Sequence, residues 1–223
     1  MPNTDHNRLI KNAAKSLLGP IGCVQKGTSR IWLDRQPLWV GVVEFQPSSW
    51  SKGSYLNVGA CWLWYEKGNL SFDDGYRVEQ FQSLDNAEQC AEVALGLATQ
   101  ARDEVLILRS KFSSLELIAA HLKTKDFSNI WNNYHAAVAA TLTNDMKHAN
   151  ERFSAIAATP EHASWVIELK QRAAVLEKIT GDSLEFLDAI TRIVERSKIQ
   201  LKIEVEKVCE SGSHLSGCSA LRS

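Results

Sequence analysis

The chain has 223 residues, a hydrophobic content of 44% and a charged content of 23%, which are ordinary values for a folded globular protein. Its formal net charge of −1 lacks the basic surplus with which nucleic-acid-binding proteins neutralise phosphates, so a nucleic-acid partner is disfavoured. No apolar run approaches the ~20 residues that cross a bilayer, and the polar N-terminus has no apolar signal core, so no membrane partner is expected.

The cysteine content predicts a reducing compartment. There are five cysteines, an odd number, and no Cys-x-x-Cys motif occurs. Cys61 and Cys90 lie in apolar runs, where a free cysteine packs as a small hydrophobic residue. This is not a disulfide framework, so the sequence favours a cytoplasmic location.

The first 65 residues predict one helix followed by strands. Leu9, Ala13 and Leu17 recur at helical spacing over residues 5–18, and Gly19-Pro20 ends the run. Three segments rich in Val, Trp, Tyr and Phe then predict strands, at 28–34, 37–46 and 54–65, and residues 76–81 predict a fourth. The connections are too short for crossovers, which indicates an antiparallel meander.

Helices are predicted for the rest of the chain, from capping signals and apolar spacing. Asp85 with Glu88, Ser113 with Glu116, and Asp182 with Glu185 have capping-box spacing, and Thr159-Pro160 is typical of a helix start. The predicted helices cover about 85–108, 113–123, 127–157 with a break near Thr143, 159–179 ending before Gly181, and 182–208.

The predicted fold class is α+β: a small antiparallel sheet backed by helices, followed by an all-helical bundle or hairpin. Strands occur consecutively instead of alternating with helices, which argues against a parallel βαβ fold. The composition shifts to all-helical near residue 124. We therefore predict an α+β domain over 1–123, a helical region over 124–208 and a small polar tail over 209–223.

The N-terminal half resembles a bacterial family catalogued as domain of unknown function 4304. The resemblance rests on Gly22, Lys26-Gly27, the strand ending in Phe45-Gln46-Pro47-Ser48, and Asn57-Val58-Gly59. It covers roughly residues 5–122. The chain has Gly22-Cys23 where such families often have Gly-Phe, and Glu44 where they often have Asn. The resemblance implies a bacterial source and a fold, and it implies no activity.

Alternation along the strands predicts two different sheet faces. We expect Trp39, Val43, Phe45, Val58 and Trp62 to pack against the helix at 85–108. If the register permits, the polar residues gather on the other face as a small-ligand site or as a solvated surface with cross-strand pairs. Those residues are Arg30, Asp34, Glu44, Gln46, Tyr55 and Asn57.

Other chemistry finds little support in the sequence. No phosphate-binding glycine loop, serine-hydrolase motif or His-Glu-x-x-His zinc motif occurs, so we expect no cofactor and no metal. Cys209, His214 and Cys218 would need a fourth ligand to hold zinc. Five basic residues cluster near the N-terminus, as a local basic patch or as a solvated helix face: Arg8, Lys11, Lys15, Lys26 and Arg30.

The last predicted helix is apolar along two edges, and one neighbouring helix covers only one of them. We expect an antiparallel hairpin of helices 161–179 and 182–208, with Ile193, Ile199 and Ile203 on the second edge. That edge packs on the protein's own core or contacts another chain, through a protein partner or self-association.

The function predicted from these observations is that of a non-enzymatic binding or interaction protein of the bacterial cytosol. A toxin-immunity or defence-accessory role suits the family resemblance, as an analogy at the level of the fold. The alternative is an enzyme or small-ligand binder that uses the polar sheet face, with Asp34 and Glu44 as the conceivable carboxylate pair.

Overall fold

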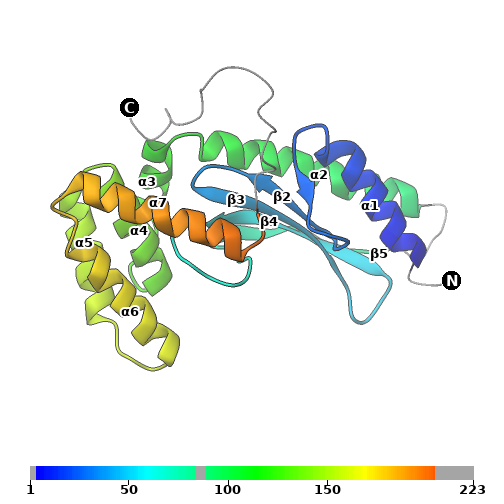
Figure 1. The fold of residues 1–223 in the computed structure, drawn as a ribbon. Helices are drawn as coiled ribbons and strands as arrows, with labels where there is room; N and C mark the ends of the chain where they lie inside the picture. The colour runs from blue at the N-terminus through cyan, green and yellow to red at the C-terminus, as the bar shows by residue number, and fades with distance from the viewer. Residues whose placement is uncertain (1–3, 84–88, 204–223) are drawn as a thin grey trace, which may run out of the picture.

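The computed structural model describes residues 4–83 and 89–203. These residues form a five-stranded antiparallel sheet with two helices on one face and five further helices gathered at one end (Figure 1). The predicted α+β fold class is confirmed. The boundary predicted between residues 123 and 124 falls between two helices that pack against each other, and the division into domains stays a prediction.

The sheet is an antiparallel meander whose strands follow chain order, as predicted. A short first strand pairs with the second strand, with Val24 opposite Leu33, and the sequence did not predict this first strand. The strands are β1 (Val24–Gln25), β2 (Ile31–Arg35), β3 (Trp39–Pro47), β4 (Gly53–Trp62) and β5 (Asp74–Ser83).

The alternation predicted for β3 and β4 is confirmed. Val43 pairs with Val58, and Phe45 pairs with Leu56. The side chains on this side are buried beneath α2 (Cys90–Lys111), which itself packs against α1 (Thr4–Leu18). We call this side of the sheet the covered face; its predicted members, all buried, are Trp39, Val43, Phe45, Val58 and Trp62.

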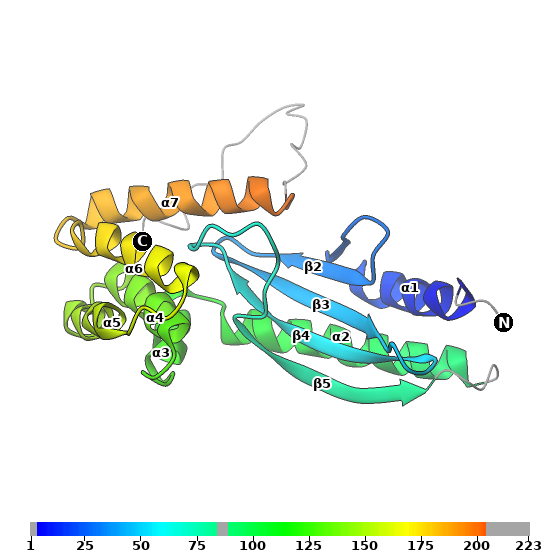
Figure 2. The same cartoon turned by 90° about the horizontal axis from the view of Figure 1, so that it is seen from below.

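The opposite side is called the open face. Figure 2 views it directly, with the strands in front of α2. Near the helical end it is buried, as Val40 and Cys61 show, whereas Glu44, Gln46 and Asn57 toward the other end are half-buried. Only this second half is therefore available to a ligand.

The helix predicted from residue 85 begins at Cys90, and Gln89 at its N-cap makes no side-chain capping hydrogen bond. The proposed capping box of Asp85 and Glu88 lies outside the described residues. The next helix, α3 (Leu115–Lys123), is capped one residue later than predicted, because the Ser114 hydroxyl accepts from the Leu117 N–H at 3.3 Å.

The predicted break near Thr143 is confirmed. α4 (Ile130–Leu142) and α5 (Met146–Ala158) are separated by a turn in which Asn144 adopts a φ of 61°. The start predicted at Thr159-Pro160 is wrong: Thr159 ends α5, and α6 (Ser164–Glu177) begins after Ala163.

The last helix, α7 (Ser183–Gln200), begins as predicted, because an Asp182 carboxylate oxygen accepts from Leu184 N and Glu185 N, each at 3.0 Å. The helix ends at Gln200 and not at the predicted residue 208. Just after this end, Lys202 adopts a φ of 55° and the Ile203 N–H donates to the Lys198 carbonyl at 2.9 Å. This arrangement is a Schellman C-cap. Residues 204–208 and the predicted tail lie outside the described residues.

α6 and α7 do not form the close antiparallel hairpin that we predicted. They are joined by a short turn but open as a V (Figures 1 and 2). α7 instead packs against α4 with its buried side chains, among them Phe186, Ile190 and Val194. The apolar stripe of α7 therefore completes the protein's own core.

Candidate functional site

Four of the six predicted site residues meet on the open face. The Asn57 amide nitrogen donates to Glu44 Oε2 at 3.0 Å and to Gln46 Oε1 at 2.9 Å. Arg77 of β5, which the sequence did not predict, donates to Asn57 Oδ1 at 3.2 Å and to Gln46 Oε1 at 3.1 Å. Its guanidinium lies 4.3 Å from the centre of the Tyr55 ring. The grouping of Glu44, Gln46 and Asn57 on one face is confirmed.

The other two predicted residues, Arg30 and Asp34, belong to the covered face. Asp34 pairs with Gly41, whose neighbours on that face are the buried Trp39 and Val43, and the Arg30 carbonyl accepts from Phe45 N. Our assumed register between β2 and β3 was therefore wrong by one residue, which reverses the faces. Asp34 and Glu44 lie on opposite sides of the sheet and do not form a carboxylate pair around one substrate.

Asp34 holds α2 against the sheet. Arg109 of α2 donates to both carboxylate oxygens, at 3.0 and 2.7 Å, and also to the Ile21 carbonyl at 2.6 Å. Asp34 is buried and Arg109 is partly exposed, and the two parallel hydrogen bonds give the contact a fixed geometry. Its role is to fix the C-terminal half of α2, and that role leaves no carboxylate oxygen free for catalysis.

A second carboxylate, that of Asp74, joins β5 to the helices. It contacts Lys111 at 3.1 Å, His121 at 2.6 Å and Lys125 at 2.5 Å. Burial opposes its charged form, but hydrogen bonds from Lys125 and His121 outweigh burial and lower the pKa of Asp74 to about 2. A carboxylate with so low a pKa is a poor general base near neutral pH, which favours a structural role.

Arg152 of α5 is fully buried and joins three segments. It donates to Asn133 Oδ1 at 2.8 Å, to the carbonyls of Lys123 and Lys125 at 3.0 and 2.8 Å, and to His148 Nε2 at 3.2 Å. These contacts satisfy the end of α3 and the connection that follows it. The guanidinium therefore acts as an internal clamp.

The β4–β5 connection, residues 63–73, is fixed at both ends. Near its end, Asp73 contacts Lys67 at 2.5 Å and accepts from the Trp62 backbone N–H at 2.8 Å. Near its start, the Arg172 guanidinium of α6 donates to the Glu66 carbonyl at 2.7 Å, and Arg196 of α7 contacts the Glu66 carboxylate at 2.9 Å. The connection thereby links the sheet to the helices at its end.

His135 lies in an aromatic cluster between the sheet and α4. The Trp64 indole N–H donates to His135 Nδ1 at 3.0 Å, and the imidazole ring lies beside the rings of Trp62 and Trp131. Its Nε2 is buried and has no partner among the described residues. Burial lowers the pKa of His135 to about 4, because a charged imidazole would lose its solvation and the bond from Trp64.

We predict that His135 makes stability depend on pH below neutrality. The pKa of His135 is about 4 in the folded chain and ~6.5 in the unfolded chain. Neutral His135 therefore contributes fully to the free energy of unfolding above pH ~6.5, and this contribution falls as the pH approaches 4. Chemical unfolding at pH 7.0 and 4.5 should show that the wild type loses about 2–3 kcal/mol more than His135→Gln. Gln keeps an acceptor for Trp64 and does not titrate. Parallel pH profiles of the two proteins would contradict this assignment.

The three predicted interaction residues do not share a surface. Ile203 is 2% exposed, Ile193 is half-buried against the core, and Ile199 is 65% exposed. The second apolar edge of α7 is therefore divided, since its end folds back onto the protein. Of the three, Ile199 alone is free to meet a partner.

A cavity of about 640 Å³ lies where the sheet meets the helices, and sequence reasoning did not find it. Trp39 and Phe112 lie on the sheet side, and Leu142 and Phe186 on the helical side. These four residues lie at least 30 positions apart in the sequence, so no local pattern indicates the cavity. We call it the junction cavity; its lining also includes Leu38, Ser114, Leu115, Glu116, Ile118, Thr141, Leu184 and Leu187.

The junction cavity has the size of a ligand-binding cavity, since such cavities measure roughly 300–1,000 Å³. Its lining mixes apolar side chains with polar ones, which also include Gln36, Ser113, Asn144 and Ser183. Glu116 is the ionisable side chain in its described lining. Leu184, at the start of α7, lines it and is 80% exposed. This geometry suits an apolar group and offers no acid–base pair.

The chain matches no protein-family model, no curated protein and no solved structure. The resemblance to domain-of-unknown-function family 4304 therefore stays a prediction. Within residues 4–83 and 89–203, no group of three or more His, Cys, Asp or Glu side chains could hold a metal ion, and no helix is long and apolar enough to cross a membrane. Cys209, His214 and Cys218 lie outside these ranges.

Proposed function

We propose that this is a non-enzymatic binding protein whose protein partner inserts an apolar side chain into the junction cavity. The observation that carries the proposal is the cavity itself, about 640 Å³ in volume, with the aromatic rings of Trp39, Phe112 and Phe186 in its lining and the exposed Leu184 at its edge. Apolar anchors that fill such pockets supply most of the binding energy at protein interfaces.

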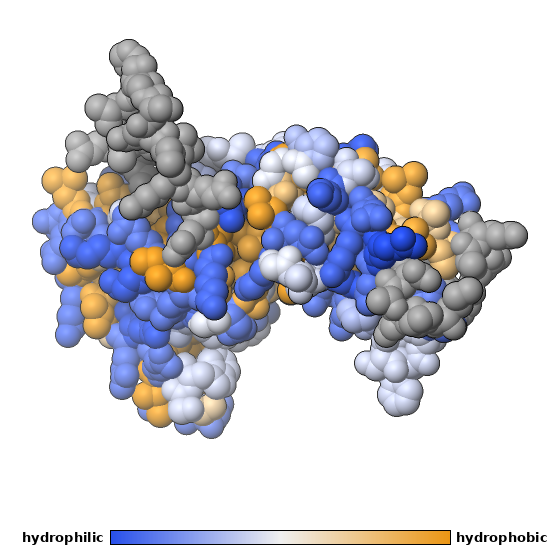
Figure 3. Space-filling model, turned by 45° about the vertical axis from the view of Figure 1, so that its right-hand side comes forward, coloured by the Kyte–Doolittle hydropathy of each residue, from blue (hydrophilic) through white to orange (hydrophobic). Residues whose placement is uncertain are grey.

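The polar groups outside the junction cavity fit a binding role better than catalysis. Figure 3 shows apolar residues scattered in small groups among hydrophilic ones on the face that it draws. The open-face polar groups bind one another, and the carboxylates of Asp34 and Asp74 are held by cations. Groups satisfied in this way favour stability over acid–base work. A cytosolic setting and a toxin-immunity or defence-accessory role are part of this proposal.

The proposal is tested by selecting peptides from a random phage-displayed library against the wild-type chain and measuring their affinity for two variants. Leu184→Lys should weaken binding about ten- to a hundredfold, the equivalent of losing one buried leucine side chain. Ile199→Lys places the same charge on an exposed position near the other end of α7 and should leave affinity within about twofold.

Leu184 and Ile199 are both exposed, so neither substitution should alter the thermal midpoint of unfolding appreciably. Peptides that tolerate Leu184→Lys but lose affinity in Ile199→Lys would identify the exposed edge of α7 as the binding surface. Peptides whose affinity changes in neither variant would exclude the junction cavity as the binding site.

A further inference from the structure

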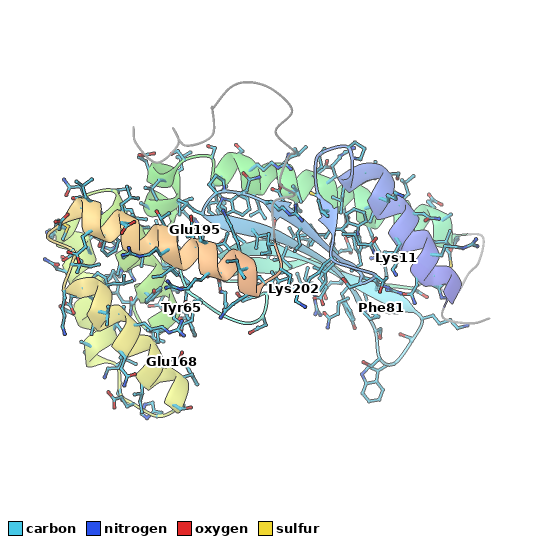
Figure 4. All side chains as sticks on the ribbon, in the orientation of Figure 1. Lys11, Tyr65, Phe81, Glu168, Glu195 and Lys202 are labelled. Carbon is cyan, nitrogen blue, oxygen red and sulfur yellow. The ribbon has the colours of Figure 1, made fainter. Side chains whose placement is uncertain are left out.

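Two residues of the basic cluster predicted near the N-terminus, Lys11 and Arg30, line adjoining cavities at the end of the sheet away from the junction cavity. Figure 4 labels Lys11 of α1 at this end. One cavity, of about 320 Å³, lies between α1, the β1–β2 turn and β3. The other, of about 350 Å³, lies between the start of α1 and the β3–β4 turn. Arg30 and Pro47 line both.

Arg30 has no counter-charge among the described residues. Its Nε donates to the Asn7 amide oxygen, while its Nη1 is buried and makes no hydrogen bond. Burial lowers the pKa of Arg30, with no carboxylate acting against that effect. Glu44 borders the first cavity, but its Oε2 accepts from Asn57. A partly buried guanidinium without a counter-charge is costly, and an anion would remove that cost.

Other groups around Arg30 also favour an anion. His6 and Lys52 line the second cavity with Arg30, and the buried Nδ1 of His6 has no partner. His6 lies in the first turn of α1, where the helix dipole favours negative charge. Hydroxyl groups complete the wall, from Ser48, Ser49 and Ser51.

An aromatic ring stands at the same cavity. Trp50, in the β3–β4 turn, is 96% exposed and lines the second cavity. An exposed indole offers a flat face on which a nucleobase can stack. Phosphate-binding cations and a stacking ring at one cavity match the two halves of a nucleotide.

We propose that this end of the sheet binds a nucleoside phosphate, with the phosphate beside Arg30, His6 and Lys52 and the base on Trp50. The inference does not rest on the proposed partner site, which lies at the other end of the sheet. Of the five basic residues that the sequence placed in a local patch, it assigns a role to Arg30.

The test is isothermal titration of the full chain with AMP, inorganic phosphate and adenosine. AMP should bind more tightly than either fragment. Arg30→Gln should weaken AMP at least tenfold, because the guanidinium is the central phosphate contact. Trp50→Ala should weaken AMP about tenfold, toward the affinity of inorganic phosphate, as expected for one lost stacking contact.

Arg35→Gln is the matched control, since it removes the same charge from the far end of β2 and lines neither cavity. Its AMP affinity should be unchanged. Without ligand, Arg30→Gln should melt no lower than the wild type, because it removes an uncompensated charge. The proposal is overturned if AMP fails to bind, if AMP binds no better than phosphate, or if Arg30→Gln and Arg35→Gln affect it equally.

Discussion

Replacing Arg152 with methionine is expected to lower the free energy of unfolding by about 3–5 kcal/mol, because several acceptors of its hydrogen bonds would be left without a donor. Methionine keeps much of the volume but donates no hydrogen bond. The carbonyls of Lys123 and Lys125 and the side chain of Asn133 would then lose their donor inside the protein. Each buried acceptor left unpaired costs about 1–3 kcal/mol.

Chemical unfolding of Arg152→Met and of a control, Arg192→Met, measures this difference. Arg192 pairs with Asp188 on the exposed side of α7, where such pairs contribute about 0–1 kcal/mol. The control should therefore unfold close to the wild type. Equal losses in the two variants would show that Arg152 does not act as a clamp.

Replacing Phe45 with alanine is expected to cost about 3–5 kcal/mol, the usual range for removing a buried phenylalanine. Phe45 is 0% exposed on the covered face, opposite Leu56 and beneath α2. The cavity left behind cannot close readily, since strands on both sides fix the backbone.

Phe72→Ala provides the comparison, because Phe72 is 38% exposed in the β4–β5 connection. It should cost well under half as much, measured by the same unfolding curves. An unchanged thermal midpoint for Phe45→Ala would refute the burial of this face.

Alternation within a strand was predictable from sequence, whereas the offset between strands was not. Trp39, Val43 and Phe45 were assigned to the correct face because the period of two is set by backbone geometry alone. The sheet face on which Asp34 lies depends on the number of residues in the β2–β3 turn. A difference of one residue in this turn moves the Asp34 side chain to the opposite face. The open-face group was therefore predicted in part, without Arg77 and with two wrong members.

Helix ends were predicted well where one residue supplies the cap and poorly where neighbours compete. Asp182 caps α7 as expected, but Ser113 and Ser114 are adjacent, and the second makes the bond. Thr159-Pro160 favours a helix start in isolation, yet Thr159 closes α5. The junction cavity and the Asp34–Arg109 contact depend on residues far apart in sequence, so no local pattern indicates them.

We expect the junction cavity to receive an apolar side chain of a partner. Intermolecular NOEs between a selected peptide and the wild-type chain would show which residues that side chain contacts. We predict NOEs from one apolar peptide side chain to the rings of Trp39 and Phe112 and to the methyl groups of Leu184, all of which line the cavity. NOEs confined to Tyr55 on the open face, or to Ile199 on the exposed edge of α7, would contradict the claim.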